Sequence, residues 1–364
     1  MKRILIVLLV GIVLLGACAC GQQPEEAEVS EQPSGTPVPT AEPVPEEPPI
    51  ALVLAGESEY TQTVAAAAQP LAEAGGYRLS VYYSADAGAQ LDDMYAAIGG
   101  GAKCIILMPI DMDNLQPVLD ECDLLKLPVV NIMVPVNGLV RVLISPDYQF
   151  MGAQAAEAVD GLSLDAANVL TIEAVDSPFV TQLVHDGFST ASGELDNVTL
   201  AASVLAAGGD VYQKTKDALA ADETLNCVFV IDEYLTPDVI RAVQEAGRAV
   251  AVVATGGGVE MQAAVEGGSV AASVFSSPYE LAELACEYAL MAADGNDAAI
   301  PQYAGLRTEV MDGQTVAQYK STGYADVMLP PQQPETEENE AEQNETDEDG
   351  QDEGEQDEGE AVDE

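Results

Sequence analysis

The sequence predicts an α/β protein with parallel sheets arranged in two similar halves. Short apolar segments rich in β-branched residues alternate with helix-like segments over about 280 residues, from Ile50 to Leu329. The apolar segments are nearly continuous, which is typical of parallel strands covered by helices on both faces. The whole pattern occurs twice, and its length exceeds what one core accommodates comfortably, so we expect two lobes built alike.

The first half contains five expected strands, with expected helices between the first four. The strands are Ile50–Ala55, Tyr77–Tyr83, Lys103–Pro109, Pro128–Val134 and Leu139–Ile144, and the helices are Tyr60–Ala74, Gly88–Ile98 and Asn114–Leu125. Pro128 stands just after the third helix, where a proline marks a helix end.

The second half repeats the pattern with five strands and five helices. The strands are Asn168–Val175, Asn197–Ala206, Asn226–Ile231, Val250–Thr255 and Ser269–Phe275, and the helices are Phe179–Thr190, Asp210–Ala221, Thr236–Ala246, Val259–Glu266 and Pro278–Ala292. Ligands of such sheets bind at the carboxyl ends of the strands. Two sets of strand ends that face each other therefore predict a cleft.

The N-terminus has the pattern of an export signal. A short basic start precedes the apolar run Ile4–Leu15, and small residues then precede Cys18. Leu15–Cys18 resembles the lipobox of bacterial lipoproteins, in which the cysteine is lipidated and becomes the new N-terminus; Cys20 is the alternative. The run is too short to span about 30 Å of hydrocarbon comfortably, which disfavours a transmembrane helix. The resemblance implies a signal peptide over residues 1–17 and a palmitate-bearing anchor on the extracytoplasmic face of the cell membrane.

Two segments flank the predicted lobes and are expected to be disordered. Residues 18–49 form a tether rich in Pro and Glu, and residues 330–364 form an acidic tail in which 17 of the 30 residues from Glu335 to Glu364 are acids. The tail fits a solubility device or a surface repellent, with a weak cation buffer as the alternative. The formal net charge is −50. Such an acidic surface repels phosphate backbones, so we expect no nucleic acid among the partners.

Neither a metal nor a cofactor is expected. Four cysteines, Cys104, Cys122, Cys227 and Cys286, lie in apolar stretches without any C-x-x-C spacing, which disfavours a zinc site. We expect buried thiols, although an exported protein could pair them as disulfides. Residues 111–113 match half of a calcium loop, but no later Gly and Glu complete it.

The stretch from Ile50 to Tyr319 resembles the type I periplasmic binding proteins, in the ribose- and galactose-binding branch of ABC-transporter solute receptors. The segments that match in order are Leu107–Leu115, Leu127–Val130, Ile144–Gly152, His185–Phe188, Phe229–Val243 and Val253–Pro278. No single segment is specific, but their order and spacing together are.

The resemblance implies two Rossmann-like lobes joined by three crossings, with a hinge that closes on a small solute. The N-terminal lobe would comprise residues 50–145 plus 278–303, and the C-terminal lobe residues 146–277 plus 304–323. It further implies a monomer that performs no catalysis and delivers its solute to an ABC permease.

Several positions depart from the sugar-gripping pattern of that family. Its receptors bind sugar hydroxyls with paired charged groups, because buried hydroxyls need partners. The paired Asp and Arg fall on Met133 and Val134, an expected Arg falls near Gln182 or Val184, an Asp on Gly256, an Asn on Asp232 and a Gln on Ser276, whereas Tyr60 keeps an expected aromatic ring.

The candidate ligand-binding residues are therefore Glu57, Glu59, Tyr60, Asp111, Met133, Asp147, Gln182, Asp232, Gly256 and Ser276. Five of them are acids, which favours a cationic or amine-bearing solute, or one with several hydrogen-bond donors. We therefore expect a small polar solute that is sugar-like or amine-bearing. Structural roles remain open for several: packing for Tyr60 and Met133, and helix caps for Asp111 and Asp147. Residues 256–258 fit a tight turn better than an anion site, and the single histidine, His185, fits a surface helix.

Two functions stay open. The first is a lipid-anchored receptor for an ABC permease. The second is a lipoprotein whose solute-binding cleft has degenerated and which acts as a sensor or a surface interaction protein. An extracellular enzyme is disfavoured, because the one histidine lies in an expected helix and no G-x-S-x-G motif occurs.

Overall fold

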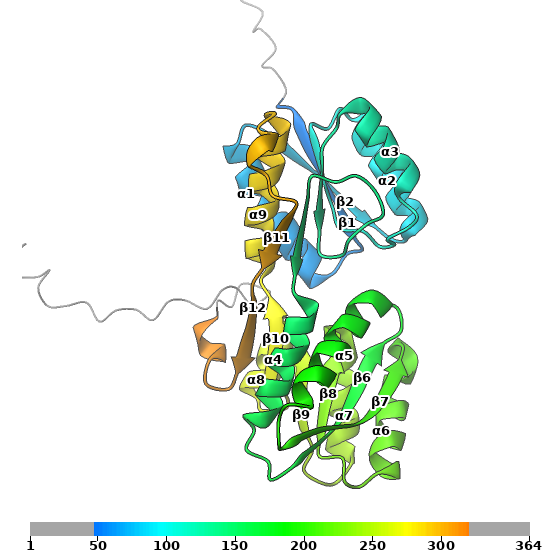
Figure 1. Ribbon diagram of the computed structural model, residues 1–364, viewed down its shortest axis with the longest axis vertical. Helices are drawn as coiled ribbons and strands as arrows, with labels where there is room; N and C mark the ends of the chain where they lie inside the picture. Colours follow the sequence, from blue (N-terminus) through cyan, green and yellow to red (C-terminus); the bar gives the residue numbers. More distant parts are fainter. Residues whose placement is uncertain (1–46, 320–364) are drawn as a thin grey trace, which may run out of the picture. The chain divides into compact units, whose positions relative to one another are not determined.

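The computed structural model describes residues 47–319 and contains two six-stranded sheets (Figure 1). The first sheet consists of β1 (Pro49–Ala55), β2 (Arg78–Ser84), β3 (Cys104–Leu107), β4 (Val129–Ile132), β5 (Val142–Pro146) and β11 (Tyr303–Leu306). Its spatial order is β11-β5-β4-β3-β1-β2, and every neighbouring pair is parallel.

The second sheet repeats this arrangement. It consists of β6 (Ala167–Ala174), β7 (Val198–Ala206), β8 (Cys227–Ile231), β9 (Ala251–Thr255), β10 (Ala272–Ser276) and β12 (Thr308–Asp312), in the order β12-β10-β9-β8-β6-β7. Its pairs are parallel except that β12 runs antiparallel to β10. The predicted α/β class with two parallel-sheet lobes is confirmed.

Helices cover both faces of the first sheet. The helices are α1 (Glu59–Ala74), α2 (Ala87–Gly99), α3 (Gln116–Leu125) and α9 (Pro278–Ala293). Ile50, Leu52 and Leu54 of β1 pack with α1 and α9, whereas Ala51 and Val53 pack with α2 and α3. Because side chains alternate along a strand, a strand that is buried on both sides must be apolar throughout. We call this sheet and its four helices the first lobe.

The second lobe contains the second sheet and five helices. The helices are α4 (Tyr148–Asp160), α5 (Pro178–Ser192), α6 (Val211–Ala221), α7 (Thr236–Glu245) and α8 (Val259–Glu266), and short 3₁₀ segments lie at Gly208–Asp210, Glu233–Leu235 and Val316–Gln318. A further 3₁₀ segment, Asp297–Ala299, lies between α9 and β11 in the first lobe. Helices α6, α7 and α8 cover one face of the sheet, and α4 and α5 cover the other. Helix α4 and strands β11 and β12 were not predicted from the sequence.

The chain crosses between the lobes three times. It passes from β5 into α4 after Pro146, from β10 into α9 at Ser277, and from β11 to β12 at Arg307. The sequence placed the last boundary at residue 303, but β11 continues to Leu306 in the first sheet. There it pairs with β5 and forms the edge of the sheet, which sets the crossing three residues later.

The four cysteines of the described region are buried and free, as expected. Burial raises the pKa of the Cys104, Cys227 and Cys286 thiols to about 12, so these groups stay protonated at neutral pH.

Helices α4 and α5 approach each other through two glycines. A Cβ added at Gly152 would lie 2.0 Å from the carbonyl oxygen of Val184, and one added at Gly187 would lie 1.9 Å from that of Gln149. The two backbones are therefore in direct contact. Next to this contact, Phe188 stacks on Phe229 of β8 with ring centroids 4.8 Å apart, which fixes α5 on the sheet.

Gly152→Ala and Gly187→Ala are each expected to lower the free energy of unfolding by about 1 to 3 kcal/mol, because overpacking must separate the two helices. Urea unfolding measures the effect. Gly99→Ala is the matched control: nothing lies within 4 Å of a Cβ added there, at the end of α2, so stability should stay the same or rise slightly. Equal stability of Gly152→Ala and the control would contradict the packing described.

Candidate functional site

The carboxyl ends of both sheets line three neighbouring chambers between the lobes. The inner chamber, of about 230 Å³, lies among the ends of β4, β8, β9 and β10. The outer chamber, of about 880 Å³, adds the ends of β1, β2 and β3 and the start of α5. A third, acidic chamber of about 540 Å³ contains Glu59, Glu233 and Glu260. Tyr60 and Asp232 line all three.

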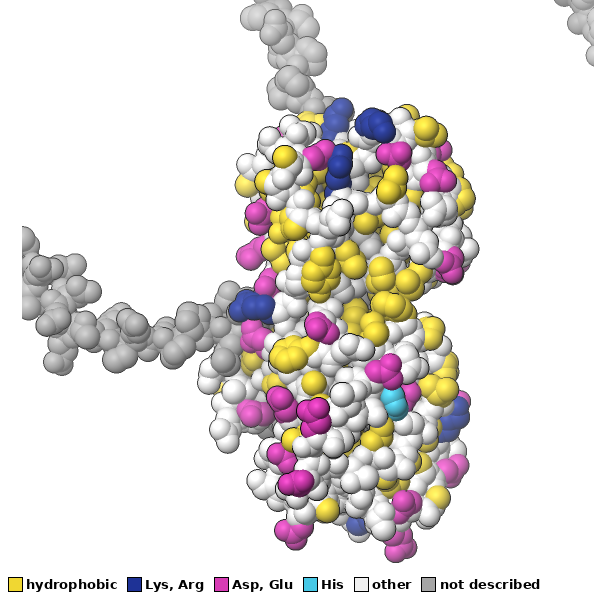
Figure 2. Space-filling model, viewed as in Figure 1, with side chains coloured by type: hydrophobic (Ala, Val, Ile, Leu, Met, Phe, Trp, Pro, Cys, Tyr) yellow, Lys and Arg dark blue, Asp and Glu magenta, His cyan; other side chains and the backbone are white. Residues whose placement is uncertain are grey.

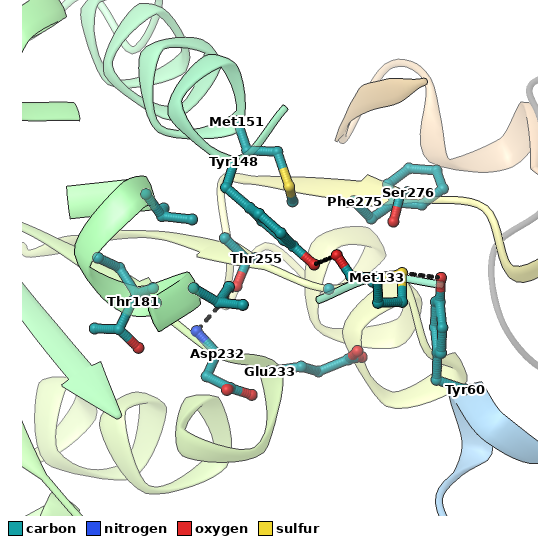
Figure 3. Close-up of a pocket in the computed structure, with 14 residues that line it drawn as sticks. Tyr60, Met133, Tyr148, Met151, Thr181, Asp232, Glu233, Thr255, Phe275 and Ser276 are labelled. Carbon is teal, nitrogen blue, oxygen red and sulfur yellow. Dashed lines mark hydrogen bonds between the residues drawn. The ribbon is translucent and has the colours of Figure 1, made fainter. Parts of the chain in front are cut away.

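The inner chamber combines an apolar wall with a few polar groups (Figure 3). The first lobe contributes Tyr60 and Met133. The second lobe contributes the apolar Tyr148, Met151, Val180, Val184, Ile231 and Phe275 and the polar Thr181, Asp232, Glu233, Thr255 and Ser276, together with Gly256. An apolar cavity with a small number of placed polar groups is the usual form of a small-molecule site.

Two residues that line this chamber, each just after a strand, have a strained backbone conformation. Met133, after β4, has φ 67°, and Asp232, after β8, has φ 111°. Such angles are costly for residues with a Cβ and occur where surrounding contacts enforce them, often in ligand sites. The carbonyl oxygen of Met133 accepts the hydroxyls of Ser145 at 2.6 Å and of Tyr148 at 3.3 Å, the latter from the second lobe.

Gly256 occupies the position after β9 that corresponds to Met133 after β4. Its φ is 120°, and an added Cβ would lie 2.4 Å from a carboxylate oxygen of Glu233, so both the backbone and the space require glycine. The turn that follows does not present free amides to an anion. Glu233 Oε1 accepts the amide of Gly258 at 2.8 Å, and Glu59 Oε1 accepts that of Val259 at 3.0 Å.

The Glu59 contact joins the two lobes directly. Glu59 is the first residue of α1 in the first lobe, and Val259 is the first residue of α8 in the second. A carboxylate at a helix N-terminus is favoured both by the unpaired amides and by the helix dipole. This contact therefore stabilises the arrangement of the two lobes seen in this structure.

The carboxyl group of Asp232 has an unusual electrostatic environment. Burial raises its pKa, the nearby Asp176 raises it further, and hydrogen bonds from Ser177 and from the amides of Tyr234 and Glu233 partly oppose the rise, which leaves a value of about 6. Asp232 also donates its backbone amide to Thr255 Oγ1 at 2.9 Å (Figure 3).

The other sequence-predicted residues take different places. Asp111 lines the outer chamber, and its carboxylate accepts the amides of Asp113 and Asn114. Glu57, Asp147 and Gln182 line none of the three chambers. Glu57 accepts a hydrogen bond from Gln62, Asp147 caps α4 through the amide of Phe150, and Gln182 donates to Asp186.

Sequence reasoning missed six residues of the inner chamber that have side chains suited to a ligand: Tyr148, Met151, Thr181, Glu233, Thr255 and Phe275. Glu233 and Thr255 stand beside predicted strand ends, and that proximity was the available signal. Tyr148 and Met151 belong to α4, which was not predicted.

The single histidine lies away from the chambers. His185 Nδ1 is 2.9 Å from Glu173 Oε1, and the pair packs between α5 and β6 in the second lobe. Within residues 47–319 no cluster of three or more His, Cys, Asp or Glu side chains is arranged to hold a metal ion. No helix in that same range is long and apolar enough to cross a membrane.

Asp232→Asn is expected to stabilise the protein at pH 7.5 but not at pH 4. The pKa of Asp232 is higher in the folded chain than its usual value near 4, so ionisation opposes folding as pH rises from about 4 to about 6. The gain at pH 7.5 should be about 1 to 3 kcal/mol in urea unfolding. If the free energies of unfolding of the parent protein and Asp232→Asn differed by the same amount at pH 4 and at pH 7.5, the raised pKa of Asp232 would be contradicted.

Glu59→Ala is expected to shift the lobes toward an open arrangement by about 1 kcal/mol, or about fivefold in population. Energy transfer between dyes on the exposed faces of α3 and α6 measures the change. Glu59→Gln should retain part of the contact, because its amide oxygen can still accept the Val259 amide. Glu57→Ala, two residues away and bonded within the first lobe, is the control. Equal energy transfer in the Glu59→Ala and Glu57→Ala proteins would contradict a stabilising contact between the lobes at Glu59.

The sequence matches the model of a known protein family. The model of the periplasmic binding protein domain matches residues 50–297. No curated protein sequence matches the chain.

Solved structures of solute-binding proteins share the fold at low sequence identity. An ABC transporter solute-binding protein from Mycobacterium smegmatis with bound glycerol has 22% identity and a TM-score of 0.67, over 76% of this chain and 99% of that one. One from Actinobacillus succinogenes with bound D-allose has 19% identity and a TM-score of 0.69, over 75% and 100%. A periplasmic ribose ABC transporter protein from Conexibacter woesei has 16% identity and a TM-score of 0.68, over 74% and 93%. The match over residues 50–297 shows that the chain belongs to the periplasmic binding protein domain family.

Proposed function

We propose that this protein is a lipid-anchored extracytoplasmic receptor that captures a small polar solute of the sugar class and delivers it to an ABC permease. One observation carries the proposal: the inner chamber lies at the strand ends of both sheets and is lined from both lobes. The structural neighbours with bound D-allose and glycerol support a polyol as the solute. The receptor binds without catalysis.

The residues of the inner chamber suit a neutral, hydroxyl-rich ligand. Asp232 and Glu233 are acceptors for hydroxyl donors, and the hydroxyls of Thr181, Thr255 and Ser276 serve as donors or acceptors. The ring of Tyr60 offers an apolar face to the C–H surface of a sugar. No Lys, Arg or His of the described region lines any of the chambers, which disfavours an anionic solute and leaves an amine-bearing sugar acceptable.

Capture proceeds by closure of the lobes. A ligand that touches both lobes stabilises the closed state by its difference in affinity for the two states. The movable points are the crossings after Pro146, at Ser277 and at Arg307. The Met133 carbonyl, bonded to Ser145 at the first crossing and to Tyr148 just beyond it, couples the chamber wall to that crossing.

One specific observation favours the second function, a sensor or surface interaction protein with a degenerate cleft. The side chain of Met133 offers only a thioether sulfur, which accepts the hydroxyl of Tyr60 at 3.5 Å, and Gly256 has no side chain, at two positions where sugar receptors of this kind carry charged groups. A degenerate cleft in a sensor or surface interaction protein would have these features. It would also leave the protein unresponsive to every small solute.

The proposed anchor and signal peptide lie outside the described residues, and so does the acidic tail. Labelling with radioactive palmitate in a bacterial host tests the anchor. Cys18→Ala is expected to abolish both the label and membrane retention, whereas Cys20→Ala should leave both unchanged. Label lost only with Cys20→Ala would assign the anchor to that residue, and no label on the parent chain would contradict lipidation.

The solute is testable by thermal melting against monosaccharides, amino sugars, polyamines and nucleosides. A true ligand at 100 times its dissociation constant should add about 2.7 kcal/mol, a shift of several degrees. Tyr60→Ala should weaken binding at least tenfold in calorimetry, because its ring lines all three chambers. Tyr95→Ala, on an exposed position of α2, is the matched control. No shift with any compound would favour the degenerate cleft.

A further inference from the structure

The outer chamber is larger than a free monosaccharide needs. Its volume is about 880 Å³, against about 230 Å³ for the inner chamber. The two chambers share Tyr60, Met133, Tyr148, Val180 and Asp232 as lining residues, so they are adjacent parts of one cleft. A ligand held in the inner chamber therefore has room to extend into the outer one.

Apolar side chains from both lobes face this space. The first lobe supplies Met108, Ile110 and Met112 from the loop after β3, and the second lobe supplies Phe179 from the start of α5. Ile110 is 40% exposed and Phe179 is 36% exposed, although both are large hydrophobic residues. Hydrophobic side chains also gather where the two lobes meet on the face seen in Figure 2. Exposed apolar surface of this kind marks binding grooves, and methionines adapt to varied ligand shapes.

The acids around the outer chamber already have partners in the protein. Asp111 accepts the amides of Asp113 and Asn114, Asp113 accepts the side-chain amide of Asn137, and Asp176 accepts the hydroxyl of Tyr234 at 2.6 Å. These bonds hold the rim loops in place. Among the large side chains that stay available to a ligand in this chamber are those of the methionines, Ile110 and Phe179.

We propose that the outer chamber binds an apolar substituent of the solute, so that the ligands of this receptor are amphipathic glycosides. The sugar ring occupies the inner chamber, and an alkyl or aryl aglycone lies between Met108, Ile110 and Met112 of one lobe and Phe179 of the other. This assignment rests on the proposed function, because it requires a sugar in the inner chamber. It gives the exposed apolar side chains of Ile110 and Phe179 a role in ligand recognition.

Calorimetry with matched glycosides on the full chain tests the assignment. The monosaccharide that gives the largest thermal shift is prepared as its methyl and its phenyl glycoside. The phenyl glycoside should bind at least tenfold more tightly than the methyl glycoside, since only its ring reaches the outer chamber. Ile110→Ser and Phe179→Ser should each reduce that ratio to about threefold or less while leaving the affinity for the methyl glycoside unchanged.

Leu124→Ser is the matched control, because Leu124 is 79% exposed on α3 and lines none of the chambers. It should preserve the full preference. Equal affinities for the two glycosides, or a preference that survives both Ile110→Ser and Phe179→Ser, would overturn this inference and leave the receptor function standing. Failure of every free sugar and both glycosides to bind would overturn the receptor function as well.

Discussion

A parallel sheet covered by helices on both faces leaves only its strand ends open to a ligand, and the rest of this molecule depends on that constraint. In each lobe, the side chains of the central strands are buried against the two layers of helices. Contacts with a ligand are therefore left to the residues just past the strands. Met133, Asp232 and Gly256 stand there with left-handed backbones, which turn the chain sharply and bring it against the chamber.

The strands and most helices could be predicted because burial on both faces demands continuous apolar runs, and these runs are visible in the sequence. Helix α4 escaped prediction because its alanines give little contrast between its two faces, and because residues 144–152 were interpreted only as a crossover. Strands β11 and β12 escaped because they are short and partly exposed, so they lack an apolar run. They pair with β5 and β10, more than 30 residues away along the chain, and no local sequence pattern reports such a pairing.

The site could be predicted as a location but only partly as a set of residues. Tyr60, Met133, Asp232, Gly256 and Ser276 line the inner chamber because each stands at a strand end or a helix start. Glu57 does not, since its carboxylate accepts a hydrogen bond from Gln62 within the first lobe, whereas Glu59, the first residue of α1, reaches α8. Gln182 follows the chamber residue Thr181 on α5, but a step of one residue turns a helix by about 100° and places it on the exposed face.

Hydrogen exchange with and without the most stabilising solute tests the central claim most directly, because it reports where the ligand acts on each lobe. The account predicts slowed exchange at the strand ends of both sheets together, around residues 56–60 and 131–134 in the first lobe and around 231–234 and 255–259 in the second. Protection confined to one lobe, or located away from the strand ends, would contradict capture of a solute between the lobes.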